Sequence, residues 1–214
     1  MEWLTSFADL VLHLDKHLLF FVQQYGDWVY ALLFAIIFVE TGIVIAPFLP
    51  GDSLLFVAGA LCVTEGMSLP LLVVLLIVAA ILGDAVNYSM GRWFGDALVH
   101  RTRLISPEKL HYTQHFFEKH GPKTIVIARF LPIVRTMAPF VAGFSGMQAK
   151  RFLTYNITGG VLWVALLTAA GYLFGNIPFV KNNLTAVILV IIFLSILPGI
   201  IAYLRARAAG NAGK

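Results

Sequence analysis

The chain has 214 residues, of which 59% are hydrophobic and only 12% are charged, whereas soluble domains carry roughly a quarter of charged residues. This composition excludes a soluble protein and predicts an integral membrane protein. The net charge of +4 does not indicate a nucleic-acid partner, because the basic residues cluster beside apolar stretches, as in cytoplasmic loops that meet anionic lipid.

Four apolar stretches are long enough to cross a bilayer, which takes about 20 residues of helix. They cover residues 28–48, 69–90, 152–174 and 184–204. The start of the chain has neither a basic n-region nor a cleavage site, so no removable signal peptide is predicted. Cys62 is the only cysteine, which excludes an intrachain disulfide and a cysteine-based metal site.

Residues 1–27 are predicted to form an N-terminal amphipathic helix, because apolar residues recur at helical spacing between residues 4 and 22. Two arrangements fit this pattern. The helix lies at the membrane interface, or it is a soluble helix packed on the membrane domain.

The stretch from residue 28 is apolar until Glu40, and then Pro47, Pro50 and Gly51 interrupt it before residues 54–63 resume a helical run. Backbone that breaks at membrane depth must be buried in protein or line a wet cavity. This favours a re-entrant hairpin with its tip near residues 47–52 and with Asp52 beside the break. The alternative is two full crossings joined by an external loop.

Residues 69–90 are predicted to cross the membrane and carry two secondary polar residues, Asp84 and Asn87, one helical turn apart. Asp84 either makes a hydrogen bond between helices, lies at the interface near the helix end, or takes part in ion handling. The helix ends in Gly-x-x-x-Gly spacing at Gly91 and Gly95, which lets helices approach closely, within one chain or in a homo-oligomer.

A second amphipathic helix is predicted after the basic loop, since Ser-Pro-Glu at residues 106–108 is a helix start and Gly-Pro at residues 121–122 is a stop. His111 and His115 are four residues apart on this helix. No third ligand stands at a metal-binding spacing, so they are interpreted as solvated surface histidines, and neither a metal nor a cofactor is predicted.

Residues 123–147 are too broken and too charged for a simple crossing, and a second re-entrant hairpin is predicted there. The segment contains two arginines and three helix-breaking positions, namely Arg129, Arg135, Pro132, Pro139 and Gly143. Residues 152–174 and 184–204 then cross, and residues 205–214 form a basic tail. The positive-inside rule places the basic loops and this C-terminus in the cytoplasm.

The chain contains an internal repeat. Ile-Val-Ile-Ala begins at residues 43 and 125, Phe-Leu-Pro at 48 and 130, Val-Ala-Gly at 57 and 141, and Gly-x-x-Phe-Gly at 91 and 171. The repeats cover about residues 28–95 and 106–175 of a membrane domain at residues 28–204. Each half has one hairpin and one sure crossing, so an inverted repeat is predicted, with a transporter-like site where the broken segments meet.

Two acids and two arginines flank the two breaks: Glu40 and Asp52, and Arg129 and Arg135. A charge at the bilayer centre costs about 2.5 to 3.5 kcal/mol on insertion scales, so these groups must pair or lie in water. One interpretation is two structural salt bridges that hold the hairpins together. The other is that a phosphate headgroup displaces a carboxylate from an arginine and that the displaced carboxylate takes up a proton.

Several motifs resemble those of the DedA family of bacterial inner-membrane proteins, which share the VTT or SNARE-associated domain. They are E-T-G at Glu40, F-L-P-G-D-S-L-L-F-V-A-G-A at Phe48, G-D-A-V-N-Y at Gly83, A-R-F-L-P-I-V-R-T at Ala128, A-P-F-V-A-G at Ala138 and S-I-L-P-G at Ser195. The resemblance implies paired re-entrant hairpins and a role in envelope integrity that depends on the proton-motive force. It also implies recycling of undecaprenyl phosphate or other phospholipids, with the family's functional acids and arginines at the four charged positions above.

The predicted function is therefore a proton-linked translocase for a polyprenyl phosphate or a phospholipid, and not an enzyme. Arg129 and Arg135 are expected to bind the phosphate headgroup, and Glu40 and Asp52 to accept protons. A proton-coupled antiporter of small cations and a non-transporting envelope scaffold are the alternatives.

Overall fold

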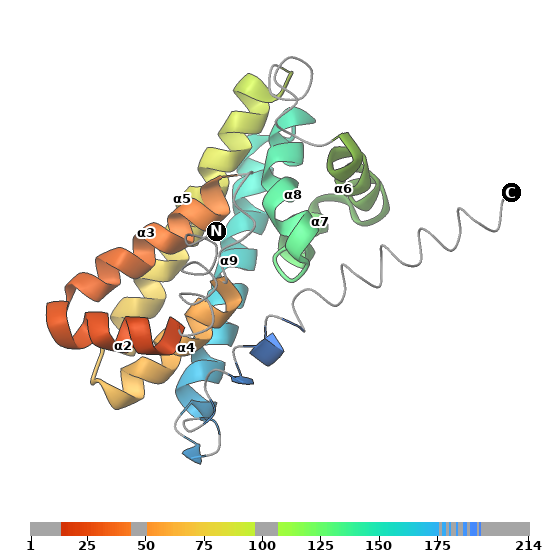
Figure 1. Ribbon diagram of the computed structural model, residues 1–214. Coiled ribbons are helices and arrows are strands. Elements are labelled where there is room, and N and C mark those ends of the chain that lie inside the picture. The colour runs from red at the N-terminus through yellow and green to blue at the C-terminus, as the bar shows by residue number, and fades with distance from the viewer. Residues whose placement is uncertain are drawn as a thin grey trace, which may run out of the picture.

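The computed structural model describes residues 14–43, 51–96 and 107–175, together with isolated positions between 177 and 193 (Figure 1). Within these residues every element is a helix, which confirms the predicted all-α class. The elements are α2 (Leu14–Tyr25), α3 (Trp28–Gly42), α4 (Gly51–Thr64), α5 (Leu69–Asp96), α6 (Pro107–His120), the 3-10 helix η2 (Gly121–Lys123), α7 (Thr124–Ala128), α8 (Pro132–Phe144) and α9 (Ala149–Phe174). The start of the chain, Pro47 and Pro50, most of the predicted helix at residues 184–204 and the basic tail lie outside the described residues.

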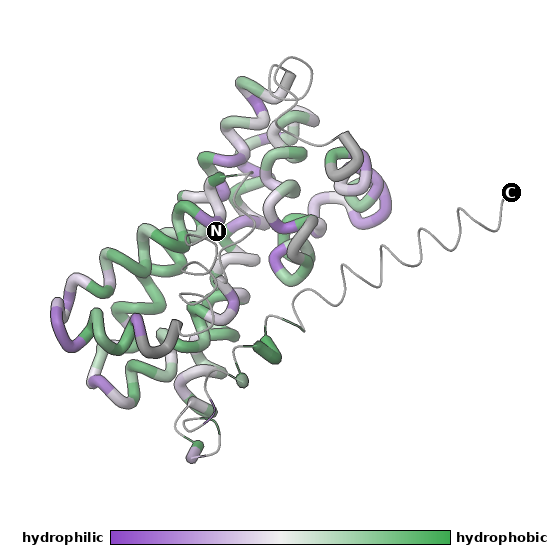
Figure 2. The backbone as a smooth tube through the Cα atoms, viewed as in Figure 1, coloured by the Kyte–Doolittle hydropathy of each residue, from purple (hydrophilic) through white to green (hydrophobic). Residues whose placement is uncertain are grey.

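Two helices in the described part are long and apolar enough to cross a membrane, at Leu69–Gly95 and Ala149–Phe174. On α5 the large apolar residues Val74, Val78, Leu82 and Val86 recur every four residues and are all at least 41% exposed. Such a stripe along a helix that is not covered by protein is suited to contact lipid tails. Figure 2 shows hydrophobic residues along α3 and α5 and hydrophilic ones gathered on α6.

Helices α3 and α4 are apolar but short, with 15 and 14 residues. At 1.5 Å per residue they rise about 22 Å, less than the roughly 30 Å of a bilayer core. Within the predicted span at residues 28–48, α3 ends at Gly42 and the described residues end at Ile43. The tip between α3 and α4 lies outside the described residues.

The two halves of the chain pack in the same way, with α4 lying along α9 and α8 lying along α5 (Figure 1). At four crossing points a glycine faces a backbone carbonyl so closely that a Cβ would overlap it. The pairs are Gly59 with Thr168, Gly171 with Phe56, Gly143 with Tyr88, and Gly91 with Phe140. Corresponding positions on α4 and α8 differ by 84 residues (143 − 59, 140 − 56), and those on α9 and α5 by 80 (171 − 91, 168 − 88), the same offsets as the sequence matches nearby. Each broken segment therefore packs on the long helix of the other half.

The second break lies at residues 129–131, between α7 and α8, and Pro132 is the first residue of α8. Proline is favoured at this position because the amide that it lacks has no helical partner there. The prediction that Pro139 and Gly143 are also breaks is wrong, since α8 continues through both. Proline is tolerated inside membrane helices that are buried in protein, and Gly143 serves close packing against the Tyr88 backbone.

The two flanking amphipathic helices are described in part. Leu18 of α2 is only 4% exposed and belongs to the apolar core that α3, α4, α5 and α9 share, so the described part of the N-terminal helix packs on the membrane domain. Helix α6 ends at His120 and is followed by Gly121 at a φ of +60°, a left-handed conformation that glycine adopts without strain. This end agrees with the predicted Gly-Pro stop.

Candidate functional site

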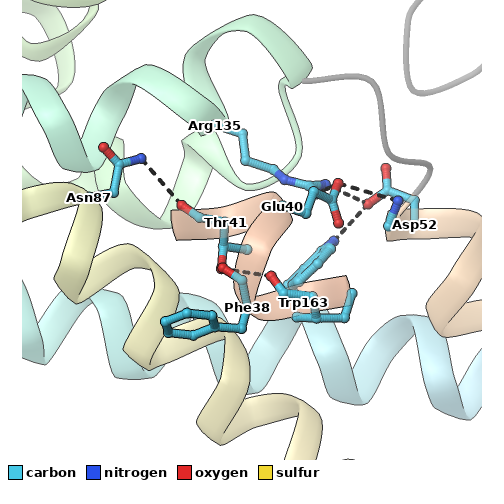
Figure 3. A network of polar contacts seen from close by, with 9 residues as sticks. Phe38, Glu40, Thr41, Asp52, Asn87, Arg135 and Trp163 are labelled. Atoms are coloured by element: carbon cyan, nitrogen blue, oxygen red, sulfur yellow. Dashed lines mark hydrogen bonds and ion pairs between the residues drawn. The ribbon is translucent and has the colours of Figure 1, made fainter. Parts of the chain in front are cut away.

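Arg135 of α8 joins both acids of the first break (Figure 3). Its Nη1 donates to Asp52 Oδ1 at 2.8 Å, and its Nη2 forms an ion pair with Glu40 Oε1. Glu40 lies in the last turn of α3, Asp52 in the first turn of α4 and Arg135 in the first turn of α8. The acids of the first half thus meet an arginine of the second half beside the helix ends.

The Glu40 carboxylate lies against the start of α4. The backbone N–H of Gly51 donates to Glu40 Oε1 at 3.3 Å, and a Cβ at Gly51 would overlap both carboxylate oxygens. Glu40 Oε2 is buried and has no hydrogen-bond partner among the described residues. Gly51, predicted only as a helix breaker, therefore makes room for this carboxylate.

Trp163 of α9 completes this cluster (Figure 3). Its indole N–H donates to Asp52 Oδ1 at 2.8 Å, and the Arg135 guanidinium carbon lies 4.4 Å from its ring centroid, within cation–π range. Trp163 was not identified from the sequence, because an aromatic residue inside an apolar helix is normally interpreted as part of the hydrophobic core. Glu40, Asp52, Arg135 and Trp163 are called the open centre below.

Arg129 does not pair with Glu40 or Asp52, which corrects the expectation that those acids would be its counter-charges. It forms an ion pair with Asp84 of α5 and donates to Asn156 Oδ1 of α9 at 2.6 Å. Asn156 in turn donates to the carbonyl of Ile81 at 3.1 Å. Asp84 is thus a charge partner, and Asn156 is a site residue that the sequence did not reveal. Asp84, Arg129 and Asn156 are called the sealed centre below.

The two centres differ in their access to the surroundings. The side chains of Arg129 and Asp84 are 2% and 6% exposed, whereas those of Arg135 and Asp52 are 11% and 20% exposed. Glycines 159 and 160 of α9 bring the helix backbone up to the Arg129 side chain, since a Cβ at Gly159 would lie 3.1 Å from its Cδ and Nε. Arg129 is therefore enclosed, while Arg135 and Asp52 are partly exposed.

Asn87 connects the two broken segments to α5. Its side-chain amide donates to the carbonyl of Thr41 at 3.2 Å and to that of Thr136 at 2.9 Å. Thr41 is the last residue but one of α3, where carbonyls lack a partner within the helix, and Thr136 follows Arg135 in α8. Asn87 therefore ties the helix ends that carry Glu40 and Arg135 to the same long helix.

Among the described residues no three His, Cys, Asp or Glu side chains gather in a group that could hold a metal ion. His111 and His115 are exposed on α6, and His115 lies 3.5 Å from Glu118. An apolar groove of about 450 Å³ lies on the outer side of α5, where Phe38, Val86, Ser89 and Trp93 are among the lining residues. None of the four residues of the open centre lines it.

Comparisons with known proteins agree on one family. The VTT domain matches residues 49–173. The protein named DedA from Escherichia coli strain K12 is 52% identical, with 100% of both chains aligned. The inner membrane protein YqjA of the same strain is 41% identical over 83% of this chain and 81% of its own, and an uncharacterized membrane protein of Mycobacterium tuberculosis is 40% identical over 88% and 85%. No solved structure matches the chain.

Proposed function

This chain belongs to the DedA family of VTT-domain membrane proteins, and from that premise we propose that it is a proton-linked lipid translocase of the bacterial inner membrane. The substrate is a lipid with a phosphate headgroup, namely undecaprenyl phosphate or a phospholipid, and its movement supports the integrity of the cell envelope. The activity is transport and not catalysis. Relatives from Escherichia coli carry the name inner membrane protein, which supports the same location for this chain.

One observation carries the proposal: Arg135 is held by two carboxylates from another part of the chain, at a place that is only partly enclosed. A guanidinium binds a phosphate with the same planar pair of N–H donors that it offers to a carboxylate. A lipid phosphate can therefore replace Glu40 or Asp52 on Arg135 without a new cation. The exposed apolar faces of α5 and α9 leave room for the lipid tail outside the helix bundle.

Proton uptake follows from the same exchange. A carboxylate that loses its arginine inside an apolar domain would be a buried charge without a partner, which is far less stable than the protonated acid. Glu40, at 4% exposure, is the more deeply buried acid and therefore the first proton acceptor, and Asp52 is the second. Phosphate binding at Arg135 and proton binding at Glu40 then favour each other.

Arg129 takes a different part in this mechanism from the one that its sequence position suggested. Its Nη2 pairs with Asp84 and also donates to Asn156 Oδ1, and its side chain is 2% exposed. We propose that the sealed centre keeps α5, α9 and the break before α8 in register, and that Arg135 alone binds the incoming phosphate.

The test uses proteoliposomes with a labelled polyprenyl phosphate or a labelled phospholipid and an imposed pH gradient. Arg135→Lys and Glu40→Gln are expected to abolish gradient-dependent translocation, because the first loses the planar fork and the second loses the titrating group. Arg151→Lys, a change at an exposed arginine of α9, is the matched control. Full translocation by both site variants would show that the proposed mechanism is wrong.

The antiporter alternative has one observation in its favour. The Arg135 guanidinium lies between two carboxylates, a position that a small cation could take if the arginine moved. Cation flux reported by a dye in the same vesicles, without lipid movement, would identify an antiporter. A scaffold would show neither flux and would tolerate the loss of both charges of a pair.

The orientation is part of the proposal as well. The basic loops and the basic C-terminal tail are expected on the cytoplasmic side. A reporter that is active only in the cytoplasm, fused after Lys214, tests this placement.

A further inference from the structure

We infer that the first turn of α4 is an anion site that Glu40 occupies as an internal substitute, and that a phosphate enters it by displacing Glu40. The ligand class is a phosphate monoester or diester. That the phosphate belongs to a lipid rests on the proposed function, whereas the site itself is argued from the contacts below.

The start of α4 and Arg135 converge on the Glu40 carboxylate. The Gly51 N–H donates to Oε1 at 3.3 Å, and Arg135 pairs with the same oxygen. Gly51 is the first residue of α4, a helix of 14 residues, and the N–H groups and dipole of a helix start attract anions. A carboxylate in this position makes the contacts that a phosphate oxygen makes at other helix starts.

Gly51 gives the site its shape. A side chain there would collide with both oxygens of Glu40, so only glycine lets an anion contact the backbone at this end of α4. The conformation of Gly51 does not require glycine, because the backbone is helical and its φ is not among the positive values. Its missing Cβ is therefore explained by the anion that it accommodates.

Glu40 fits the site incompletely. Its Oε2 has no hydrogen-bond partner, although the residue is only 4% exposed. The hydroxyl of Ser53, in the same turn of α4 and 1% exposed, also lacks a partner among the described residues. Buried polar atoms without partners are rare and need an explanation. A ligand with more oxygens than a carboxylate, and with a tetrahedral arrangement, is a suitable occupant of such a site.

The neighbouring charges explain how exchange is controlled. Asp52 is held by both Arg135 and Trp163, and it carries the same sign as Glu40 and as a phosphate. A phosphate at this site needs the Gly51 N–H and the Arg135 group that Glu40 now occupies, so Glu40 and the phosphate compete for one position. Glu40 is thus an autoinhibitory ligand, and removal of its charge is expected to strengthen phosphate binding.

The change in phosphate affinity expected on removal of Glu40 is opposite to the change expected if Glu40 had only a structural role. If Glu40 only neutralises Arg135, its removal disturbs the site and weakens anion binding or leaves it unchanged. If Glu40 occupies the phosphate position, its removal frees the Gly51 amide and Arg135 for the phosphate.

The experiment measures binding to the full chain in detergent through the fluorescence of Trp163, which touches Asp52 and Arg135. The other three of the four tryptophans are replaced by phenylalanine. One arm titrates inorganic phosphate, a second a fifteen-carbon prenyl phosphate, and a third the corresponding uncharged prenyl alcohol. The comparison of the arms separates a free phosphate ligand from a lipid headgroup.

Glu40→Ala is expected to bind phosphate about tenfold more tightly than the unchanged chain. Glu40→Gln, which keeps the shape of the side chain, is expected to shift the affinity in the same direction. Arg135→Lys and Gly51→Ala should each weaken binding by about tenfold or more, while Glu65→Gln, an acid just after α4, is the control and should change nothing. Equal or weaker phosphate binding by both Glu40 variants, or no binding by any variant, overturns the inference.

The two proposals fail in different ways. Tighter phosphate binding by the Glu40 variants without lipid translocation by the unchanged chain would support the site and contradict the transport function. Translocation that is intact in vesicles, with weaker phosphate binding by both Glu40 variants, would support transport and contradict the site.

Discussion

The sealed centre is expected to determine how stable the fold is, and Asp84→Leu is the change that tests it. The substitution leaves the Arg129 guanidinium, 2% exposed, with Asn156 as its remaining partner among the described residues and without a counter-charge in the sealed centre. Removing one member of a buried ion pair costs about 3 to 5 kcal/mol. For a chain of this size, about 1 kcal/mol lowers the melting temperature by roughly 2 to 4 °C, so a fall of roughly 6 to 20 °C is expected.

The double variant separates the effect of the lost pair from general damage. Asp84→Leu with Arg129→Met removes both charges and keeps most of the side-chain volume. Replacement of a complete buried pair by apolar residues is often neutral or stabilising, so the double variant should melt near the unchanged chain. Asp52→Asn in the open centre is the comparison, since Arg135 keeps Glu40 and the Asp52 side chain is 20% exposed, and it should lower the melting temperature much less.

The assay is thermal unfolding of the detergent-purified chain, followed by the fraction that stays monodisperse after heating. Lipid translocation by the double variant is measured in parallel and should persist, because Arg129 is not expected to contact the headgroup. Asp84→Leu that melts at the same temperature as the unchanged chain, or a double variant as unstable as the single one, would contradict a stabilising role of the buried ion pair.

Three further outcomes are expected. Alanine at Gly143 or at its counterpart Gly59 places a methyl group on a backbone carbonyl of the facing helix, so each should lower the melting temperature by several degrees. If both variants melted at the same temperature as the unchanged chain, the shared packing would be contradicted. Trp163→Phe keeps a ring beside Arg135 but loses the N–H that binds Asp52 and some of the packing of a fully buried indole, so it should slow translocation and also lower the melting temperature. Tyr88→Phe removes a hydroxyl that donates to the Met147 carbonyl and accepts from Arg92 Nη1, at a cost of about 1 kcal/mol for each hydrogen bond, detectable as a fall in melting temperature with translocation unchanged.

The local features of this protein were readable from its sequence because they depend on neighbouring residues. Apolar length predicted α5 and α9, Gly121 marked the end of α6, and the break predicted at Pro132 lies where α8 begins. Each of these follows from backbone propensity or from the length of an apolar run. Pro139 was misjudged because the surroundings of a buried helix, and not the residue alone, decide whether a proline ends it.

The repeat and the charged residues were also visible in the sequence, because identical short motifs and charges in apolar segments stand out without any structure. The motifs further identified the family, which the comparisons confirm. The sequence thus determined that Glu40, Asp52, Arg129 and Arg135 needed partners, since an unpaired charge is too unfavourable inside a membrane.

Only the tertiary structure decided which partners they have. The packing of the break before α8 against α5 brings Arg129 to Asp84, and the approach of α3, α4 and α8 gathers Glu40 and Asp52 on Arg135. These ion pairs depend on how helices far apart in the chain pack together. The packing uses glycine contacts, and the spacing of the glycines in the sequence does not show which side chain faces each of them. The division into a sealed centre and an open one, and the place of Trp163 and Asn156 in them, follow from that packing.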